Sequence, residues 1–600
     1  MKKKESMTMD TPSQITDKKY RFDSFANGEV FPGKTTGRLP MMGWNSWNAF
    51  GSSNSEALTK AMADCITELG LDKLGYKYLV LDDGCYKSER VNGLLANEEI
   101  KFPSGFRALS DYIHAKGLKF GMYNDIGSNL CAGAAVGTCG HEKEDARSYT
   151  EWGVDFIKVD NCYYLWDNAT FSNAENARFT YAPHIKSIRL EGKETKLELS
   201  AASDGRITGA GPCITDDGCV ANIGTFDGTG PVQSPAGDMS GELTFDMKDI
   251  PEGEYDLYVT YASGREPEKG QWLQIATGTG ENTEYFYDDL LPESKEGEYA
   301  VSDAIKITLK KDTGVIRLMN HRRQENTLCS YAALLEGFYE ADKDHEIVMS
   351  LCEWGKTQPQ NWGYKVGDSW RILNDITFQV GADGNPGHGD WSSDYTPGVA
   401  TQYNKAVIMD EFAGLNKGWN DPDMLMVGMD GLDLTMCRTH FSMWCMMNSP
   451  LMLGLDLRRV RKDDDLYRII ANGEMIALNQ DPLGIQAKRV YTTTGSAHPD
   501  TEYIRDNKRA DILAKPLAGG GLAIAFFNLD EEACSAELSI DFEAVMSYMG
   551  KKMDSEIFMN ASEYRVRDLW TGEESVTGEK KISVKELPAH GDAVFKITPV

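Results

Sequence analysis

Apolar and polar positions alternate in two different rhythms along this chain. Four short apolar runs, at 39–47, 76–84, 118–125 and 154–161, each end in polar or aromatic residues. Amphipathic segments at 54–75, 105–117 and 143–153 lie between them; the first begins at the cap-type residue Ser55, and the other two end in glycine. Strands that alternate with helices of this length predict a parallel sheet.

The rhythm changes at about residue 183. From there to about 326, strand-like runs are separated by Gly, Asp, Asn and Pro, which predicts an all-β sandwich inserted as a unit. The α/β rhythm then resumes with a helix at 329–342. Further strands are expected at 345–354, 369–376, 418–428 and within 441–454. Eight strands in total favour a closed (β/α)₈ TIM barrel over an open sheet.

These boundaries predict an α/β protein with three folded parts. The expected units are a polar N-terminal extension (1–21), a catalytic (β/α)₈ barrel (22–182 and 327–484), an inserted β-sandwich (183–326) and a C-terminal antiparallel β domain (485–600).

Charge narrows the range of partners. The formal net charge of −30 disfavours nucleic acid and anionic lipid, whereas a neutral sugar meets no such penalty. No apolar run reaches the roughly 18 residues of a membrane helix. The basic N-terminus lacks an apolar signal region, so we expect a cytoplasmic protein as the sequence stands, or a secreted one if a leader was removed. A homo-oligomer is compatible with the sequence.

The sequence contains none of the common metal-binding motifs that we looked for. HExxH, CxxC and Walker patterns are absent and the nine histidines are scattered, so we expect no protein-built zinc site.

The run "FIKVDNCY" at 156–163 places two charged residues in an apolar strand. Lys158 and Asp160 are two positions apart, so they share one face of the strand and point together into the barrel mouth. Other strand ends carry the same types of residue, namely Trp44, Trp47, Asp82, Asp83, Tyr123, Asp125, Cys352, Glu353, Trp354, Arg371, Asp375, Asp421 and Asp423. Any one of these aspartates could be a helix cap and any tryptophan a packing residue. Together, carboxylates and aromatic faces suit a neutral polyol.

Eight motifs carry a family resemblance. In order they are "MGWNSWNAFG", "LVLDDG", "KFGMYNDIG", "IKVDNCY", "SLCEWG", "SWRILNDI", "GWNDPDMLMVG" and "LNQDPLG". They resemble glycoside hydrolase family 27, the retaining α-galactosidases (melibiases) and α-N-acetylgalactosaminidases. The resemblance covers about 22–180 and 328–600, and it implies a (β/α)₈ barrel with a C-terminal β domain.

The resemblance also implies roles for individual residues. Asp160 matches the nucleophile and Asp375 the general acid/base of a double displacement, which requires carboxyl groups roughly 5–5.5 Å apart. Asp160 is then expected to be ionised and Asp375 protonated. The implied substrate-binding set is Trp47, Asp82, Asp83, Tyr123, Cys131, Lys158, Cys162, Cys352, Glu353, Trp354, Arg371 and Asp423. Cys131 and Cys162 match a disulfide beside the pocket, whereas Ser52 and Gly84 stand where relatives often pair cysteines.

Substrate choice depends on the space around the sugar 2-position. Trp354 is expected to crowd an acetamide group, which favours hydrolysis of terminal α-D-galactosyl residues from an oligosaccharide or glycoconjugate; the alternative is an α-N-acetylgalactosaminidase. The Asp82–Asp83 pair argues against an arabinopyranosidase. A binding protein without catalysis would require loss of Asp160 or Asp375, and both are present.

The insert follows the nucleophile strand, so it enters at the catalytic face of the barrel. It loosely resembles carbohydrate-binding modules; a spacer, lid or oligomer contact is the alternative. Cys213 and Cys219 close a small loop or remain free thiols, and the acidic stretch 215–218 permits a structural calcium. The expected reaction needs no cofactor.

Overall fold

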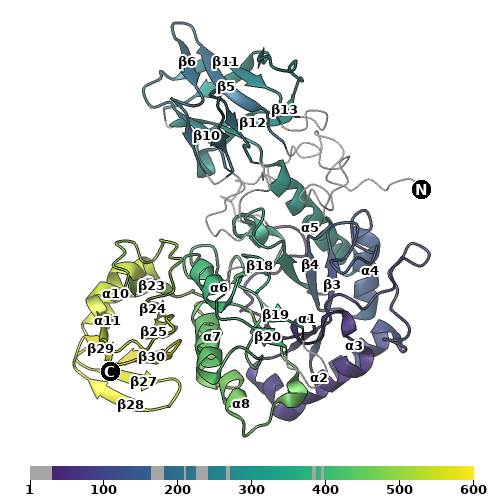
Figure 1. Cartoon of the computed structure of the whole chain (residues 1–600), viewed down its shortest axis with the longest axis vertical. Helices are drawn as coiled ribbons and strands as arrows, with labels where there is room; N and C mark the ends of the chain where they lie inside the picture. Colours follow the sequence, from purple (N-terminus) through teal and green to yellow (C-terminus); the bar gives the residue numbers. More distant parts are fainter. Residues whose placement is uncertain are drawn as a thin grey trace.

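The computed structural model describes residues 30–163, 181–208, 211–224, 241–264, 271–311, 313–376, 378–380, 387–392 and 397–600. Figure 1 shows a central barrel, a β-sandwich joined to it by helix α5 (Arg322–Ala341), and a C-terminal β domain beside α6 (Val399–Ala406) and α7 (Leu434–Met446). Within these ranges, no helix combines the length and the apolar character of a membrane span.

Eight parallel strands form the barrel. They are β1 (Met42–Asn45), β2 (Tyr78–Val80), β3 (Lys119–Asp125), β4 (Phe156–Asp160), β17 (Val348–Cys352), β18 (Ser369–Arg371), β21 (Trp419–Asp421) and β22 (Leu451–Leu453). The order across the sheet is β21-β18-β17-β4-β3-β2-β1-β22. A parallel bridge joins Leu425, just after β21, to Leu453 of β22 and closes the ring. The (β/α)₈ prediction is confirmed.

Helices follow the strands of this ring along the chain. They are α1 (Trp47–Phe50), α2 (Glu56–Leu69), α3 (Gly105–Ala115), α4 (Glu142–Trp152), α5 (Arg322–Ala341), α6 (Val399–Ala406), α7 (Leu434–Met446), α8 (Asp465–Ile470) and α9 (Gly473–Asn479). Ser55 caps α2 by accepting a hydrogen bond from the Leu58 N–H, as predicted. Gly153 ends α4 at a φ of 74°, a left-handed conformation that glycine adopts without strain.

The predicted strands are longer than the observed ones. The segment 369–376 forms a strand only over Ser369–Arg371, because the chain leaves the sheet where it presents Arg371 and Asp375. The apolar residues Leu425 and Met426 lie beyond the end of β21 and are fully buried, and Leu425 forms only the isolated bridge to β22.

The insert is a sandwich of two antiparallel sheets. One contains β13 (Glu284–Leu291), β12 (Gln271–Thr277), β16 (Val315–Met319), β10 (Leu243–Asp246) and β7 (Arg206–Ile207). The other contains β14 (Ala300–Val301), β11 (Gly253–Ala262), β5 (His184–Glu191), β9 (Val220–Ala221), β8 (Cys213–Ile214), β15 (Ile305–Leu309) and β6 (Lys196–Ser200). Alternate residues such as Leu257 and Val259 on β11 face a core separate from that of the barrel.

Helix α5 begins earlier than the pattern predicted. It starts at Arg322, seven residues before the expected start and inside the range assigned to the insert. Its first turns contain buried polar residues (Arg322, Arg323, Gln324 and Glu325), so no apolar periodicity marks them as helical. Figure 1 shows α5 as the link between the sandwich and the barrel.

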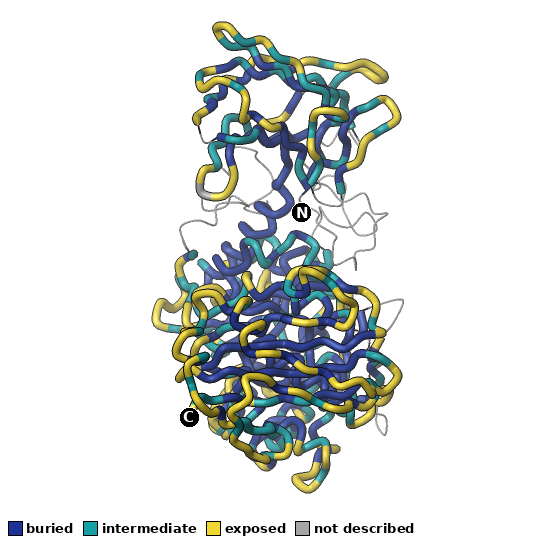
Figure 2. The backbone as a smooth tube through the Cα atoms, turned by 90° about the vertical axis from the view of Figure 1, so that its left-hand side faces the viewer, coloured by how far each residue is buried: buried dark blue, intermediate teal, exposed yellow. Residues whose placement is uncertain are grey.

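The C-terminal domain is built on a six-stranded antiparallel sheet. Its strands are β23 (Lys488–Thr492), β24 (Ala510–Pro516), β25 (Leu522–Asn528), β30 (Asp592–Pro599), β27 (Tyr564–Asp568) and β28 (Glu574–Thr577). Four further elements pack against this sheet: β26 (Leu538–Asp541), β29 (Lys581–Val584), α10 (Phe542–Met549) and α11 (Ser555–Met559). β19 (Phe378–Gln379) and β20 (His388–Gly389) form a separate two-stranded antiparallel sheet. The buried strands are dark blue in Figure 2, and the yellow exposed positions concentrate in loops.

Candidate active site

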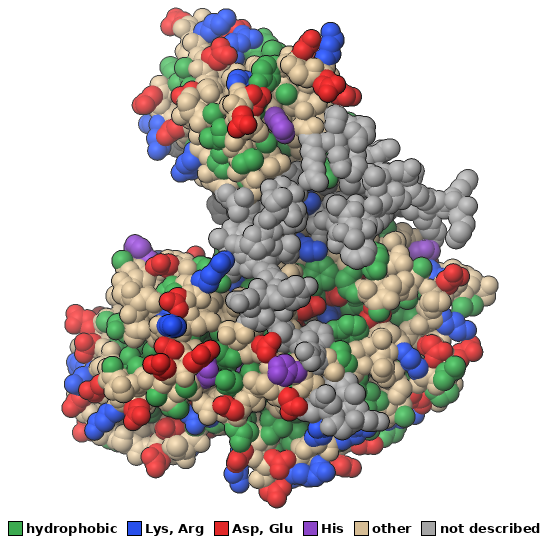
Figure 3. Space-filling model, in the orientation of Figure 1, with side chains coloured by type: hydrophobic (Ala, Val, Ile, Leu, Met, Phe, Trp, Pro, Cys, Tyr) green, Lys and Arg blue, Asp and Glu red, His purple; other side chains and the backbone are tan. Residues whose placement is uncertain are grey.

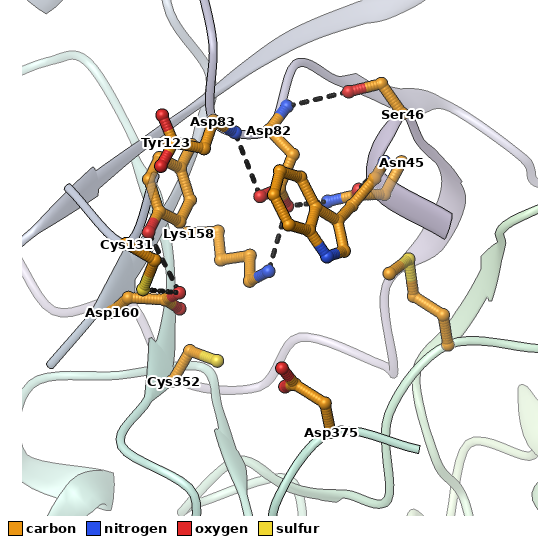
Figure 4. Close-up of polar contacts among 12 residues, drawn as sticks. Asn45, Ser46, Asp82, Asp83, Tyr123, Cys131, Lys158, Asp160, Cys352 and Asp375 are labelled. Carbon is orange, nitrogen blue, oxygen red and sulfur yellow. Dashed lines mark hydrogen bonds and ion pairs between the residues drawn. The ribbon is translucent and has the colours of Figure 1, made fainter. Parts of the chain in front are cut away.

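A cavity opens at the carboxyl ends of the barrel strands. Its lining residues are Trp47, Asn48, Asp82, Asp83, Tyr123, Cys131, Lys158, Asp160, Arg371, Asp375, Asp423 and Met424. They come from β1, β2, β3, β4, β18 and β21 or from the loops that follow, where TIM barrels carry their chemistry. Figure 4 shows the carboxylates of Asp160 and Asp375 on opposite sides of the Cys352 thiol.

Asp160 is the buried carboxylate at the end of β4. The Tyr123 hydroxyl donates a hydrogen bond of 2.9 Å to its Oδ2, while Oδ1 has no hydrogen-bond partner in the described part of the chain. Cys131 Sγ lies 3.2 Å from Oδ2, but this sulfur belongs to a disulfide and carries no proton to donate. Oδ2 of Asp160 is therefore hydrogen-bonded by Tyr123, and Oδ1 accepts no hydrogen bond from the described residues.

Lys158 reaches the same cavity from the same strand face, as the two-residue spacing predicted. Its ammonium group donates to Asp82 Oδ2 at 2.8 Å, and Asn45 Nδ2 donates to the same oxygen at 2.8 Å. Burial alone would lower the pKa of Lys158, but the Asp82 and Asp160 carboxylates raise it well above its ordinary value. The site thus contains a positive charge next to the carboxylates of Asp82 and Asp160.

Asp83 is held by backbone groups rather than by a cation. The N–H groups of Gly84 and Ala132 donate to its two carboxylate oxygens at 2.6 and 2.7 Å. Burial raises the pKa of Asp83 above its ordinary value, in spite of these donors.

Arg371 joins two further carboxylates. Its Nη2 lies 2.9 Å from Asp375 Oδ1 and 2.8 Å from Asp423 Oδ2. The Ile376 N–H also donates to Asp423 Oδ2 at 2.8 Å, so Asp423 fixes the backbone next to Asp375. The Asp375 side chain itself is half exposed, which leaves it accessible to a bound molecule.

The environments of Asp160 and Asp375 separate their two pKa values in the sense opposite to the one predicted. Burial raises the pKa of Asp160 to about 7, against the opposing effect of Lys158. Desolvation also disfavours the charged form of Asp375, but Arg371 and Lys158 outweigh it and lower the pKa of Asp375 below its ordinary value. These pKa directions run against the predicted ionised Asp160 and protonated Asp375, because the guanidinium group contacts Asp375; the protonation states themselves stay a prediction.

Four of the predicted substrate-binding residues do not line the cavity: Cys162, Cys352, Glu353 and Trp354. Glu353 is fully buried and accepts hydrogen bonds from the N–H and hydroxyl of Thr357, so its carboxylate orders the loop after β17. Cys352 lies between Asp160 and Asp375, with Sγ 3.5 Å from Arg371 Nη1. The Trp354 side chain donates to Asp375 from the rim, and the Lys356 ammonium covers its ring at 4.3 Å.

The Cys131–Cys162 disulfide is present, with 5.3 Å between the Cα atoms, while Cys213 and Cys219 are free thiols. Among the described residues, Asp125, Cys131 and Cys162 are the one set of three groups spaced for a metal ion. Because both sulfur atoms are bonded to each other, they are not the thiolates that a metal requires.

The sequence analysis did not name Asn48 or Met424, and it counted Asp125 among the strand-end residues without giving it an individual role. Asn48 and Met424 line the cavity, next to the predicted Trp47 and Asp423 in the chain. Asp125 is fully buried behind the disulfide, where it accepts the N–H groups of Gly127 and Cys162, each at 2.6 Å. Burial and the neighbouring Asp160 raise the pKa of Asp125 to about 8. Its place at the end of β3 was the one available signal.

The comparison with family models identifies the same family as the sequence motifs. Residues 39–182 and 388–481 match the family model described as "Alpha galactosidase A", and residues 507–597 match "Alpha galactosidase C-terminal beta sandwich domain". The two models together cover more than half of the chain. The chain belongs to glycoside hydrolase family 27. The segments that match the first model leave out 183–387, which contains the inserted sheets.

Relatives of this family member align over nearly its whole length. The Alpha-galactosidase A of Cellvibrio japonicus is 28% identical over 568 residues, which is 94% of this chain and 92% of that protein. The Alpha-galactosidase of Cyamopsis tetragonoloba is 26% identical and covers 94% of this chain and 87% of that protein. The structure of alpha-galactosidase from Saccharomyces cerevisiae with raffinose superposes with a TM-score of 0.56 at 21% identity, covering 94% and 98% of the two chains; it supports the fold.

Proposed function

We propose that this glycoside hydrolase is a retaining α-galactosidase, which releases terminal α-D-galactosyl residues by double displacement. The observation that carries the proposal is that Asp160 and Asp375 line one cavity with Asp82, Asp83 and Lys158. The first pair supplies a nucleophile and an acid, and the other three residues supply acceptors and a donor for sugar hydroxyls.

In the first step, Asp160 Oδ1 attacks the anomeric carbon as the bond to the leaving oxygen breaks and Asp375 protonates that oxygen. The hydrogen bond from Tyr123 to Oδ2 keeps the carboxylate oriented and stabilises its charge. In the second step, Asp375 takes a proton from water, which attacks the covalent β-galactosyl ester and releases α-galactose with retained configuration.

One shared proton reconciles this mechanism with the raised pKa of Asp160 and the lowered pKa of Asp375. A protonated Asp160 with an ionised Asp375, and the reverse arrangement, carry the same total charge and differ in the position of one proton. The reactive arrangement is then a constant fraction of the singly protonated pair between the two apparent pKa values. The reaction needs the proton to reside on Asp375, which a bound glycoside favours by placing its leaving oxygen there.

The proposed substrates are neutral galactosyl oligosaccharides or glycoconjugates. Acidic and basic side chains are interspersed over the face in Figure 3, and the chain carries a net charge of −30, so a neutral substrate meets no repulsion. The structure of the Saccharomyces cerevisiae neighbour contains raffinose. Trp354, at the rim beside Asp375, supports galactose over its N-acetylamino form, and α-N-acetylgalactosaminidase activity is the alternative.

The proposed reaction uses side chains alone. A structural calcium at 215–218 of the insert, sugar binding by the insert and a cytoplasmic location remain predictions.

Hydrolysis of para-nitrophenyl α-galactoside and of the matching α-N-acetylgalactosaminide tests the proposal, with the wild type compared to Asp160→Asn. Galactoside turnover that the substitution abolishes supports it. Preference for the N-acetylated substrate would transfer the proposal to the alternative. Turnover that survives the substitution would remove Asp160 from the mechanism.

A further inference from the structure

The turn that presents Asp82 and Asp83 is held through its backbone carbonyls. The Asn54 side-chain amide donates to the backbone carbonyl oxygens of Asp82 and Asp83 at 3.0 and 3.1 Å. The Lys101 ammonium donates to the next carbonyl, Gly84 O, at 2.8 Å. Three consecutive carbonyls of the turn are therefore bonded by side chains from outside it.

The same ammonium group also joins the turn to the loop after β1. Lys101 Nζ donates to Ser52 O at 2.6 Å, so one charge connects Ser52 and Gly84. The two backbones are in direct contact here, because a Cβ atom added to Gly84 would lie 2.7 Å from Ser52 Cα. Gly84 has a φ of 101° and no side chain with which to hold Ser52, so at this point Lys101 supplies the link. The Asn54 amide holds the carbonyls of Asp82 and Asp83 to the same loop.

The backbone of Lys101 is itself fixed. Its N–H donates to the Glu98 carboxylate at 2.8 Å, and its carbonyl accepts the N–H of Glu56, the first residue of α2, at 2.9 Å. The following residue, Phe102, is fully buried in the barrel core. The lysine side chain thus extends from an ordered base to its two carbonyls.

We propose that Lys101 is a positioning residue for the sugar-binding carboxylates Asp82 and Asp83, an inference that rests on the proposed function. The group of Lys101 Nζ, Ser52 O and Gly84 O, which we call the carbonyl clamp, keeps the two aspartates in place before sugar binds. Lys101 touches neither carboxylate. It lies in the floor of an open cleft lined also by Asp83, adjacent to the catalytic cavity.

A pre-ordered turn lowers the entropic cost of binding, so loss of the carbonyl clamp weakens substrate binding more than chemistry. We expect Lys101→Met to raise KM for para-nitrophenyl α-galactoside about tenfold, equivalent to about 1.4 kcal/mol, with kcat changed less than about twofold. Lys101→Arg, which can still donate to two carbonyls, is expected to recover most of the affinity. Lys87→Met is the matched control, because Lys87 lines the same cleft but pairs with Glu99.

Amide hydrogen exchange provides the readout that is independent of turnover. The segments around 51–54 and 82–86 are expected to exchange faster in Lys101→Met than in the wild type and in Lys87→Met. Unchanged exchange there, or a KM equal to that of the control, would overturn the proposal, as would a fall in kcat at constant KM. If Lys101→Met fails to fold, Lys101→Arg provides the test of the carbonyl clamp. Amide exchange rates and a KM close to those of the wild type support the proposal, and rates and a KM that differ from the wild type oppose it. A wild type that does not hydrolyse galactosides would refute the proposed function, while exchange would still test the clamp.

Discussion

Asp160 in the barrel is a buried carboxylate and Glu242 in the insert is a largely buried one, and their properties are opposite. Asp160 has one strong donor, Tyr123, and an oxygen without a partner, and its pKa rises to about 7. Both oxygens of Glu242 are paired with the Arg317 guanidinium at 2.7 and 2.6 Å, and His321 lies 3.1 Å away. Burial would raise the pKa of Glu242, but these donors lower it to about 2.

The difference shows that burial alone does not decide how a carboxylate behaves. A bidentate arginine satisfies both oxygens and makes Glu242 a structural group between β16 and α5. The free oxygen of Asp160 costs stability, which is typical of a group kept for reaction with a substrate. The comparison predicts that the same change, acid to amide, affects activity at one site and stability at the other.

The largest expected effect is on the Asp160 side of the comparison. Asp160→Asn removes the attacking carboxylate and is expected to lower kcat/KM for an aryl α-galactoside by about 10⁴-fold or more. Steady-state kinetics on protein free of wild-type contamination measures it. Glu242→Gln is the matched control and should leave kcat/KM within about twofold of the wild-type value. Equal losses of kcat/KM in the two variants would contradict the distinction between a reactive Asp160 and a structural Glu242.

Asp375→Ala is expected to separate acid catalysis from nucleophilic attack. The loss should be about 10²–10⁴-fold for an oligosaccharide, whose leaving oxygen needs a proton, and smaller for an activated aryl galactoside. The measurement is kcat/KM for substrates of different leaving-group acidity. A loss that is the same for all leaving groups would argue that Asp375 does not donate the proton.

Glu242→Gln should act on stability. Removing the charge leaves Arg317 buried without its ion pair, and we expect a loss of about 3 kcal/mol in the unfolding free energy of the insert. Denaturant unfolding followed in the insert checks this, with the exposed Glu252→Gln as control.

The stabilisation from Glu242 also depends on pH. Because its pKa in the folded protein, about 2, is below the ordinary glutamate value of about 4.3, the stabilisation is complete above that value and is lost as the pH falls toward 2. A variant whose stability matches the wild type at neutral pH would contradict the structural role.

The pH profile of activity gives the smallest but most diagnostic effect. The reactive pair carries one proton, so kcat/KM should fall as pH rises through about 7, where that proton is lost. It should also fall in acid, below the ordinary aspartate pKa, where Asp375 gains the second proton. A profile that stays flat well above pH 7 would show that the raised pKa of Asp160 does not persist in solution.

Much of this arrangement could be predicted from the chain. The eight barrel strands and the convergence of Lys158, Asp160 and Asp375 follow from periodicity, the strand-end rule and the family motifs. The sense of the pKa separation could not, because it depends on which carboxylate Arg371 contacts in three dimensions. Glu353 illustrates the same limit: its motif indicated substrate binding, but its side chain turns back to Thr357. The early start of α5 was hidden because its first turn is polar and buried.

Trapping the covalent intermediate tests the central claim most directly. The enzyme is incubated with a fluorinated α-galactosyl donor that forms the ester rapidly and hydrolyses slowly, and the modified peptide is located by mass spectrometry. The account predicts one hexosyl group per chain, on Asp160, with α-galactose as the first product of the normal reaction. A label on Asp375, or no label together with β-galactose as the first product, would contradict it.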